Sequence, residues 1–527
     1  MIPVMKNDAV IPASARFERG GGGFLFRPGT TIAYSGAGVA PVVERFCKAV
    51  ARRTGLRLAP VAGLPAPNEP FVTIELAAGD EFGALPGSAG VSPTGDRPPD
   101  ERHSLAIDGD QVVVRAVKPV GVARGLATLI QLLATGTEGA VVPAARILDA
   151  PRWAWRGLSL DVARAYFTLG EIRRVIDLLE LYKLSVLHLH LTDDQSWRLP
   201  VGRPAGRAEP GGACYSAEDL RALTAYAADR FVAIVPEVDT PGHVSAIVGM
   251  HPELDTGRNV GEFELAPGRT QHAAWLDPDL PATFDVVGEV LTGVAGIFPG
   301  PYIHIGADEP YGMPHGLYTS YVQRVRGLVR SLGKRPLGWQ EAARAGLGPD
   351  DVIQYWICGT AFPGSLPSEV RAELDAEIAL SRRDVQTAVA ASLPVIVSPQ
   401  SHCYLDVPYA EPSADPAQEL RRGRVGLRVY APRTVAESFD WEPTEALGPG
   451  RAAQVGGVEA AVWAETVSDF DDLSFLLLPR LAGVAHKAWS AADGTTWADH
   501  RDRLARHGLL WAQDGLTYFR SSAVDWL

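Results

Sequence analysis

Two adjacent carboxylates, Asp308 and Glu309, follow the short apolar run at residues 302–306. Neighbouring carboxylates that are partly desolvated repel each other, so their pKa values separate and one holds a proton near neutral pH. Cleavage of a glycosidic bond needs such a carboxylic acid to protonate the leaving oxygen, and Glu309 has the longer reach. The alternative is an Asp-Glu pair that caps the next helix, and it explains the pair taken alone.

Polar and aromatic residues also follow the other short apolar runs of the second part of the chain. A single Trp is more often packing and a single Asp is usually solvated, but repetition around one rim favours a site. Aromatic faces stack on pyranose rings, and charged groups hydrogen-bond to hydroxyls, so the set suits a sugar. Its members are Arg164, Asp193, Asp194, Asp239, His243, Trp339, Trp356, Tyr404, Asp406, Trp463 and Glu465.

Short apolar runs that alternate with helical patterns must position these residues. We expect strands at residues 157–161, 186–191, 232–236, 302–306, 335–339, 352–356, 395–398 and 457–463. Helical patterns lie at 169–182, 217–229 and 475–489. About eight strands predict a (β/α)8 TIM barrel, whose reactive groups sit past the carboxyl ends of the strands. A doubly wound open sheet has the same alternation and is the alternative.

The first 150 residues predict a smaller mixed unit. We expect helices at 41–53 and 120–133, a strand at 71–76 and a hairpin at 105–114. Asp108-Gly109 would supply the positive φ angles of a tight turn in that hairpin. The Gly, Pro and Asp-rich stretch 79–101 is interpreted as a long surface loop. The fold class is therefore α/β, with a small α+β domain at 1–150 before a barrel with C-terminal helices at 151–527, and an insertion at 360–394.

Composition excludes several function classes. The net charge of −13 disfavours nucleic-acid binding, and no run of about 18 apolar residues predicts a membrane span. The first eight residues do not resemble a signal peptide, so we expect a cytoplasmic protein, or a secreted one whose leader was removed. The four cysteines form no C-x-x-C pair, which disfavours a zinc ribbon or a disulfide scaffold.

Seven motifs in chain order resemble glycoside hydrolase family 20, the β-N-acetylhexosaminidases. They are RGLSLDVAR (156–164), LYKLSVLHLHLTDDQSWR (181–198), VPEVDTPGH (235–243), HIGADE (304–309), LGW (337–339), SPQSHCYLD (398–406) and GVEAAVWAE (457–465). The first part of the chain resembles the small α/β domain of the family at residues 107–110 and 125–133.

This resemblance implies an exo-acting, retaining, substrate-assisted reaction, in which the acetamide oxygen of the substrate attacks the anomeric carbon and forms an oxazolinium ion. Glu309 would be the general acid and then the base. Asp308 would hold the acetamide N–H and Tyr404 would donate to the acetamide oxygen. No metal or cofactor is implied. The partner would be an oligosaccharide or glycoconjugate that contains N-acetylhexosamine, either GlcNAc or GalNAc, and a homodimer is compatible with the sequence.

The resemblance also gives the other residues roles in binding the sugar. Three indoles would wall the pocket, three charged groups would bind the distal hydroxyls, and two residues would form a second layer. In that order they are Trp339, Trp356 and Trp463, then Arg164, Asp406 and Glu465, then Asp193 and His243.

One departure and three rival readings stay open. The family usually has Gly-Gly before the Asp-Glu pair, and Ala307 replaces the second Gly here. The rivals are a non-catalytic sugar-binding barrel, a lacto-N-biosidase-like enzyme that releases a disaccharide, and a metal-dependent hydrolase that uses His188, His190 and Asp193. We interpret His188, His190 and His304 as polar groups of the barrel interior rather than metal ligands.

Overall fold

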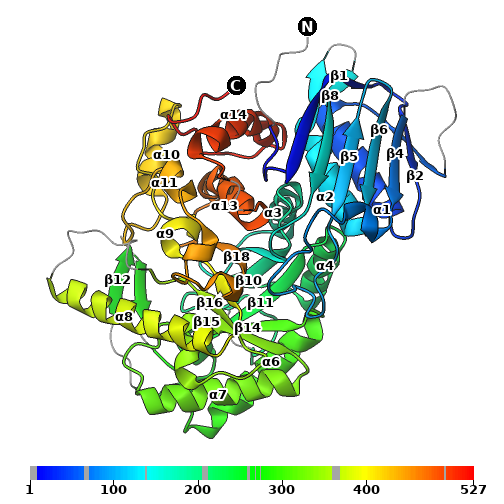
Figure 1. Cartoon of the computed structure of the whole chain (residues 1–527). Helices are drawn as coiled ribbons and strands as arrows, with labels where there is room; N and C mark the ends of the chain where they lie inside the picture. The colour runs from blue at the N-terminus through cyan, green and yellow to red at the C-terminus, as the bar shows by residue number, and fades with distance from the viewer. Residues whose placement is uncertain are drawn as a thin grey trace.

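A computed structural model describes residues 9–63, 71–136, 139–204, 212–257, 262–266, 269–272, 274–358, 368–491 and 494–527. The N-terminal part forms a sheet that lies beside a barrel, and the C-terminal helices lie near the junction of the two (Figure 1). The prediction on the first eight residues, and parts of the predicted insertion at 360–394, lie outside the described residues. No helix of the described residues is long and apolar enough to cross a membrane.

The N-terminal sheet has the strand order β1-β8-β5-β6-β4-β2-β3, with β7 paired to β8. The strands are β1 Arg16–Phe26, β2 Thr31–Tyr34, β3 Ala59–Ala62, β4 Phe71–Leu76, β5 His103–Ile107, β6 Gln111–Ala116, β7 Ala134–Gly136 and β8 Gly139–Asp149. Helices α1 Ala40–Thr54 and α2 Pro119–Leu132 and the β5–β6 hairpin match the predictions. The long pair β1–β8 was not predicted, because β1 contains a run of glycines, which strands usually avoid.

The turn of the β5–β6 hairpin corrects one expectation. Neither Asp108 nor Gly109 has a positive φ. Instead the Asp108 carboxylate accepts hydrogen bonds from the backbone N–H groups of Asp110 and Gln111, both at 2.9 Å. An aspartate that closes a turn through its own side chain replaces the backbone geometry that the dipeptide predicted.

The second unit is a closed parallel barrel in the order β10-β11-β14-β15-β16-β17-β18-β9, so the open-sheet alternative is wrong. Its strands are β9 Trp155–Asp161, β10 Val186–His190, β11 Ala233–Thr240, β14 Tyr302–Gly306, β15 Arg335–Trp339, β16 Val352–Tyr355, β17 Val395–Val397 and β18 Val455–Val462. All eight overlap the predicted runs. A separate hairpin, β12 Glu262–Ala266 and β13 Arg269–His272, was not predicted.

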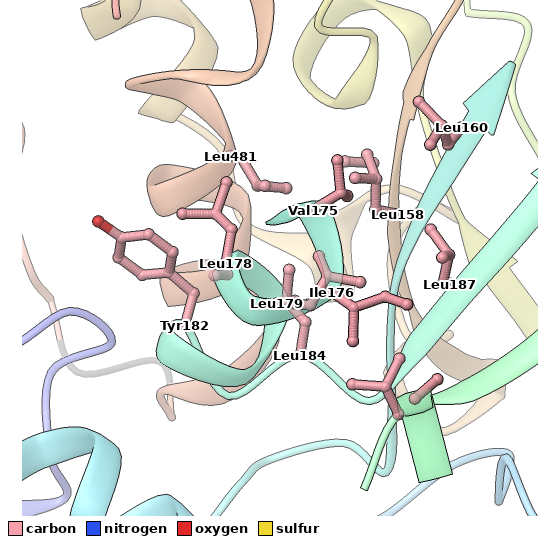
Figure 2. Packing of buried hydrophobic residues seen from close by; sticks show 14 of the residues in the cluster. Leu158, Leu160, Val175, Ile176, Leu178, Leu179, Tyr182, Leu184, Leu187 and Leu481 are labelled. Atoms are coloured by element: carbon pink, nitrogen blue, oxygen red, sulfur yellow. The ribbon is translucent and has the colours of Figure 1, made fainter. Parts of the chain in front are cut away.

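Helices surround the barrel and cover its outer apolar face. Leu158 and Leu187 project outward from neighbouring strands and pack against Val175 and Ile176 of α3 (Figure 2). The helices are α3 Leu169–Leu181, α4 Ala217–Ala228, α5 Ser245–Met250, α6 Pro281–Ile297, α7 His315–Ser331, α8 Ser368–Ala390, α9 Gln400–Cys403, α10 Glu419–Arg424, α11 Val435–Phe439, α12 Phe470–Leu477, α13 Arg480–Trp489 and α14 Trp497–Gln513. The single helix expected at 475–489 is two, α12 and α13, because Pro479 cannot continue a helix.

The stretch 79–101 is not only a surface loop, as the sequence predicted. Val91 is 6% exposed and packs in an apolar layer at the base of the barrel. Its N–H donates to the carbonyl of Gly456 at 2.7 Å. A Cβ at Gly90, where φ is +81°, would lie 2.2 Å from the same carbonyl, so only glycine allows this close approach. The loop therefore closes the amino-terminal end of the barrel.

Buried ion pairs join the two units. Glu101 lies between Arg124 and Arg156, with both shortest contacts at 2.8 Å. Asp149, at the end of β8, contacts Lys183 at 2.7 Å. Because each of these charges is buried and paired, the loss of one partner would leave an uncompensated charge and fix the two units less firmly.

Candidate active site

The upper half of the barrel interior is polar. Strands alternate inward and outward side chains, so β10 turns Val186, His188 and His190 inward while Leu187 and Leu189 face the helices. β11 carries Glu237 and Asp239 at buried positions, and Glu237 pairs in register with His190. The inward residues thus change from apolar at the base to charged toward the carboxyl ends of the strands.

The catalytic candidates Asp308 and Glu309 stand on a bent segment directly after β14. Gly306, Ala307 and Glu309 have φ values of 66°, 78° and 47°. A Cβ at Gly306 would lie 1.7 Å from a carboxylate oxygen of Asp239, so glycine is required there. Ala307 adopts the second left-handed position despite its methyl group, and its backbone bonds to Thr240 and to the Tyr318 hydroxyl hold it there. Left-handed backbone at an alanine stores strain of about 1–2 kcal/mol.

The pKa values of Asp308 and Glu309 are separated, as the sequence predicted. The sense is the opposite of the prediction, because Asp308 and not Glu309 has the raised pKa. Burial raises the pKa of Asp308 to about 6, and the Glu309 and Glu237 carboxylates oppose its ionisation further. Burial also favours protonated Glu309, but the hydrogen bond and charge of His243 outweigh it and lower the pKa of Glu309. Asp308 therefore binds a proton more tightly than the expected acid, Glu309.

His243 connects the pair to the barrel interior. Its Nε2 lies 3.4 Å from Glu309 Oε2 and 3.7 Å from Asp308 Oδ2. Its Nδ1 lies 3.4 Å from Asp193 Oδ1. Although burial disfavours the imidazolium, the carboxylates of Asp193 and Asp239 hold the pKa of His243 well above its usual range. A cation between these carboxylates stabilises the ionised form of Glu309 in the empty site.

Asp193 lies behind the groups at the mouth, in keeping with the second layer that the family resemblance implies for it. The residue is 1% exposed, and its Oδ2 contacts Arg164 at 2.7 Å and His190 Nε2 at 2.8 Å. Arg164 in turn donates to Gln195, and its guanidinium lies 5.4 Å from the centre of the Trp463 ring. Asp193 is thus a buried support that orients Arg164 and His243.

Four aromatic side chains form a connected wall. Tyr404 stacks on Trp356 with an angle of 3° between the rings, and Trp463 lies 5.9 Å from both Tyr404 and Trp339. Trp339 is 1% exposed, whereas Trp463 is only partly buried. The sequence placed all four at one rim, and the structure brings them together.

Three carboxylates carry acceptors that the protein itself leaves open. Asp308 Oδ1, Asp406 Oδ2 and Glu465 Oε2 are buried and have no hydrogen-bond partner among the described residues. Burial and the nearby Glu465 carboxylate hold the pKa of Asp406 well above its usual range, and Glu465 also lies near Arg164. Buried acceptors without partners cost stability, so a set of them marks a place where polar ligand groups bind.

The sequence interpretation missed three residues of this region. Tyr311 hydrogen-bonds to the Glu309 side chain, and its ring is 41% exposed. Glu341 is buried beside Asp308 and accepts from the Trp356 indole at 3.1 Å. Glu237 lies at the centre of the interior polar layer. Tyr311 is two residues past Glu309, Glu341 is two residues past Trp339, and Glu237 is in the middle of VPEVD. The two acids were visible signals, since an acid in a buried run needs a partner.

The barrel histidines make ion pairs with carboxylates, as expected for interior polar groups. His190 bridges Glu237 and Asp193, and His188 lies between Glu237 and Glu459. His188, Glu237 and His304 have the spacing of a metal site. Burial lowers the pKa of a histidine, yet Glu237 and Glu459 raise the pKa of His188 to about 9. Carboxylates thus face both ring nitrogens of His188, which is the arrangement of a buried charge pair.

Comparison with known proteins decides the family. A model described as "Glycosyl hydrolase family 20, catalytic domain" matches residues 153–316 and 311–492, and one described as "Glycosyl hydrolase family 20, domain 2" matches residues 7–150. The chain belongs to glycoside hydrolase family 20. This family 20 chain is 36% identical over 438 residues to a β-N-acetylhexosaminidase of Cellulomonas fimi, covering 81% of this chain and 82% of that one.

Solved structures agree with the family assignment. The GH20 β-N-acetylhexosaminidase of Streptomyces coelicolor A3(2) has a TM-score of 0.80 and 30% identity, over 99% of both chains. A mutant β-hexosaminidase of Streptomyces plicatus in complex with the product GlcNAc has a TM-score of 0.81 and 29% identity, over 99% of this chain and 98% of that one. The family 20 chain is therefore a glycosidase on a (β/α)8 barrel with the α/β domain before it.

Proposed function

We propose that the mouth of this barrel hydrolyses terminal β-linked N-acetylhexosamines with the acetamide group of the substrate as nucleophile. Membership of family 20 makes the chain an exo-acting β-N-acetylhexosaminidase. The proposal concerns the division of labour among the residues. The observation that carries it is the set of buried, unpartnered oxygens on Asp308, Asp406 and Glu465 beside the connected aromatic wall.

Asp308 is the group that aims the acetamide. Its free Oδ1 accepts the acetamide N–H, and that hydrogen bond favours the ionised carboxylate. The negative charge then stabilises the positive charge that develops on the oxazolinium ring. Tyr404 donates its hydroxyl to the acetamide oxygen and directs it at the anomeric carbon.

Glu309 supplies the proton to the leaving oxygen and later removes one from water. Its pKa is low in the empty site because His243 is cationic. A bound sugar and its aglycone exclude water from Glu309, and ionisation of Asp308 raises the pKa of its neighbour further. Substrate binding therefore favours ionised Asp308 and protonated Glu309, which agrees with the assignment made from the sequence.

The remaining residues hold the sugar. Asp406, Glu465 and Arg164 bind its distal hydroxyls, with the free oxygens of the two acids as acceptors. Trp339, Trp356 and Trp463 contact the ring and the acetamide methyl group. The substrate is an oligosaccharide or glycoconjugate that carries N-acetylhexosamine at its non-reducing end.

Aryl glycosides of GlcNAc, GalNAc and lacto-N-biose, compared side by side, test the proposal. We expect release of p-nitrophenol from the monosaccharide substrates and a much lower kcat/KM for the disaccharide. Turnover of the disaccharide alone would favour a lacto-N-biosidase-like enzyme, and binding without turnover would favour a sugar-binding barrel. Loss of activity with a chelator, restored by zinc, would support a metal-dependent hydrolase instead.

A further inference from the structure

One carboxylate inside the barrel contacts groups that lead to both sides of the site. Glu237 on β11 is completely buried. Its Oε1 accepts the indole N–H of Trp339 at 2.8 Å, and its Oε2 accepts from His190 Nδ1 at 2.6 Å. His304 Nδ1 lies 2.9 Å from Oε1 and His188 Nε2 lies 3.1 Å from Oε2. One oxygen therefore contacts Trp339 and His304, and the other contacts His190 and His188.

We propose that Glu237 is a positioning residue for the reaction, which fixes the Trp339 wall through one oxygen and the charge chain behind Glu309 through the other. The inference rests on the roles proposed above for Trp339, Glu309 and their neighbours. Glu237 touches no reacting atom, so its effect is transmitted by the residues that it holds.

The first branch is short and orients an indole. Trp339 is 1% exposed, and the hydrogen bond to Glu237 fixes which way its ring plane faces. The ring packs 5.9 Å from Trp463 at an angle of 50°. Rotation of Trp339 would therefore displace the next aromatic of the wall as well.

The second branch is a chain of alternating charges that ends at the proposed acid. His190 lies between Glu237 and Asp193, and its Nε2 is 2.8 Å from Asp193 Oδ2. Asp193 Oδ1 in turn lies 3.4 Å from His243 Nδ1. His243 then contacts Glu309 at 3.4 Å. Each member stabilises the charge of the next, so neutral Glu237 would weaken the cation on His190 and the orientation of Asp193.

The groups that face Glu237 determine the effect on the pH dependence. They are His188 and His190 from β10, His304 from β14, Asp308 past β14, and Asp239 on its own strand. Glu237 raises the pKa of His188 and His190 and opposes the ionisation of Asp308. Removal of its negative charge therefore lowers the pKa of Asp308 and moves the acidic limb of the pH profile to lower pH.

Glu459 is the matched control. It is also completely buried, and it contacts the other side of His188 at 2.9 Å. Its remaining partners among the described residues are Gln354, which pairs in register with Trp339, and Trp155 of the apolar base layer. If buried His–carboxylate pairs had a purely structural role, substitution of either acid would have the same effect. Among the described residues, however, Glu459 contacts neither Trp339 nor His190.

The experiment compares Glu237→Gln with Glu459→Gln on p-nitrophenyl N-acetyl-β-glucosaminide over a range of pH. We expect Glu237→Gln to lower kcat/KM about 10- to 100-fold, since a misplacement of about 1 Å can cost about 10²-fold. The acidic limb of this variant should move to lower pH, while Glu459→Gln keeps the wild-type profile. Equal loss in both variants, or an unmoved profile in Glu237→Gln, would overturn the inference.

Two further variants interrupt the branches singly and serve if Glu237→Gln does not fold. Trp339→Phe removes the indole N–H and should raise KM, with the pH profile unmoved. His190→Asn interrupts the contacts that lead from Glu237 to Asp193 and should lower kcat. Full activity in both would contradict the inference. A wild-type enzyme without turnover would instead refute the proposed function, so the two failures are distinguishable.

Discussion

The two ends of the same barrel differ in what they bury. At the base, Val91 from the N-terminal unit packs with Trp155, Val186 and Tyr302 in an apolar layer. At the mouth, the same strands end in carboxylates that are buried with open acceptors. The base is therefore built for packing, whereas the mouth holds three carboxylate oxygens that no described residue satisfies by a hydrogen bond.

This difference teaches where stability and activity reside. Buried acids with raised pKa values, such as Asp308, cost folding free energy and persist because the surrounding strands hold them. The apolar base and the helices outside offset that cost. Substitutions at the two ends should therefore separate: those at the mouth change turnover and those at the base change the free energy of unfolding.

The largest expected effect is that of Glu309→Gln at the mouth. Loss of the general acid and base should lower kcat about 10²- to 10⁴-fold. The melting temperature should stay close to that of the wild type, because the amide fills the same space beside His243. Thermal unfolding and initial rates measured on one preparation check both statements. An active Glu309→Gln enzyme would show that the active site does not lie at the mouth.

A smaller loss is expected for Asp308→Asn, together with a change in pH dependence. The amide cannot stabilise the developing positive charge, so kcat should fall about 10²- to 10³-fold. In the wild type Asp308 must be ionised to act, and its pKa of about 6 means that activity declines as the pH falls through that value. The decline in kcat/KM should be absent from the residual activity of Asp308→Asn. A wild-type profile that stays flat down to pH 4 would contradict this assignment.

At the base, Val91→Ala should affect stability alone. Truncation of a buried aliphatic side chain leaves a cavity and costs about 1–3 kcal/mol. Chemical denaturation should show a lower free energy of unfolding, while kcat/KM of the folded enzyme equals that of the wild type. A proportionate loss of turnover would mean that the base is coupled to the mouth.

The smallest effect is expected at Ala307, which lies at the mouth but should affect stability rather than turnover. Glycine relieves the left-handed strain of about 1–2 kcal/mol but adds freedom to the unfolded chain worth about 0.4–1 kcal/mol. Ala307→Gly should therefore raise the melting temperature slightly and leave kcat unchanged. A lower melting temperature would show that contacts of the buried methyl group outweigh the strain.

The fold could be predicted from the sequence wherever a local pattern decides it. The barrel strands are runs of about five apolar residues between helical patterns, and each run overlaps a strand of the structure. β1 and β8 could not be found in this way, because glycines in one and Pro143 in the other hide a pairing that only the whole sheet stabilises. The closing of the barrel base by the loop 79–101 depends on contacts distant in sequence, which local turn signals do not record.

The candidate site divides in the same manner. Residues that follow strand ends, such as Asp308, Trp463 and Glu465, could be predicted from the sequence because barrel geometry dictates where strand ends meet. The contacts of Asp193 could not be predicted, since the sequence does not show that Arg164 and His190 enclose it. Nor could composition predict on which carboxylate the proton resides, which depends on a histidine contact across two loops.

The most direct test is the rate of hydrolysis of two aryl β-glucosides that differ only in the substituent at C2. One carries the 2-acetamido group and the other a hydroxyl. If the substrate supplies the nucleophile and Asp308 aims it, the acetamido compound should be cleaved at least about 10³-fold faster, the scale of a lost intramolecular nucleophile. Comparable kcat/KM values for the two compounds would contradict substrate assistance and would require a nucleophile from the enzyme.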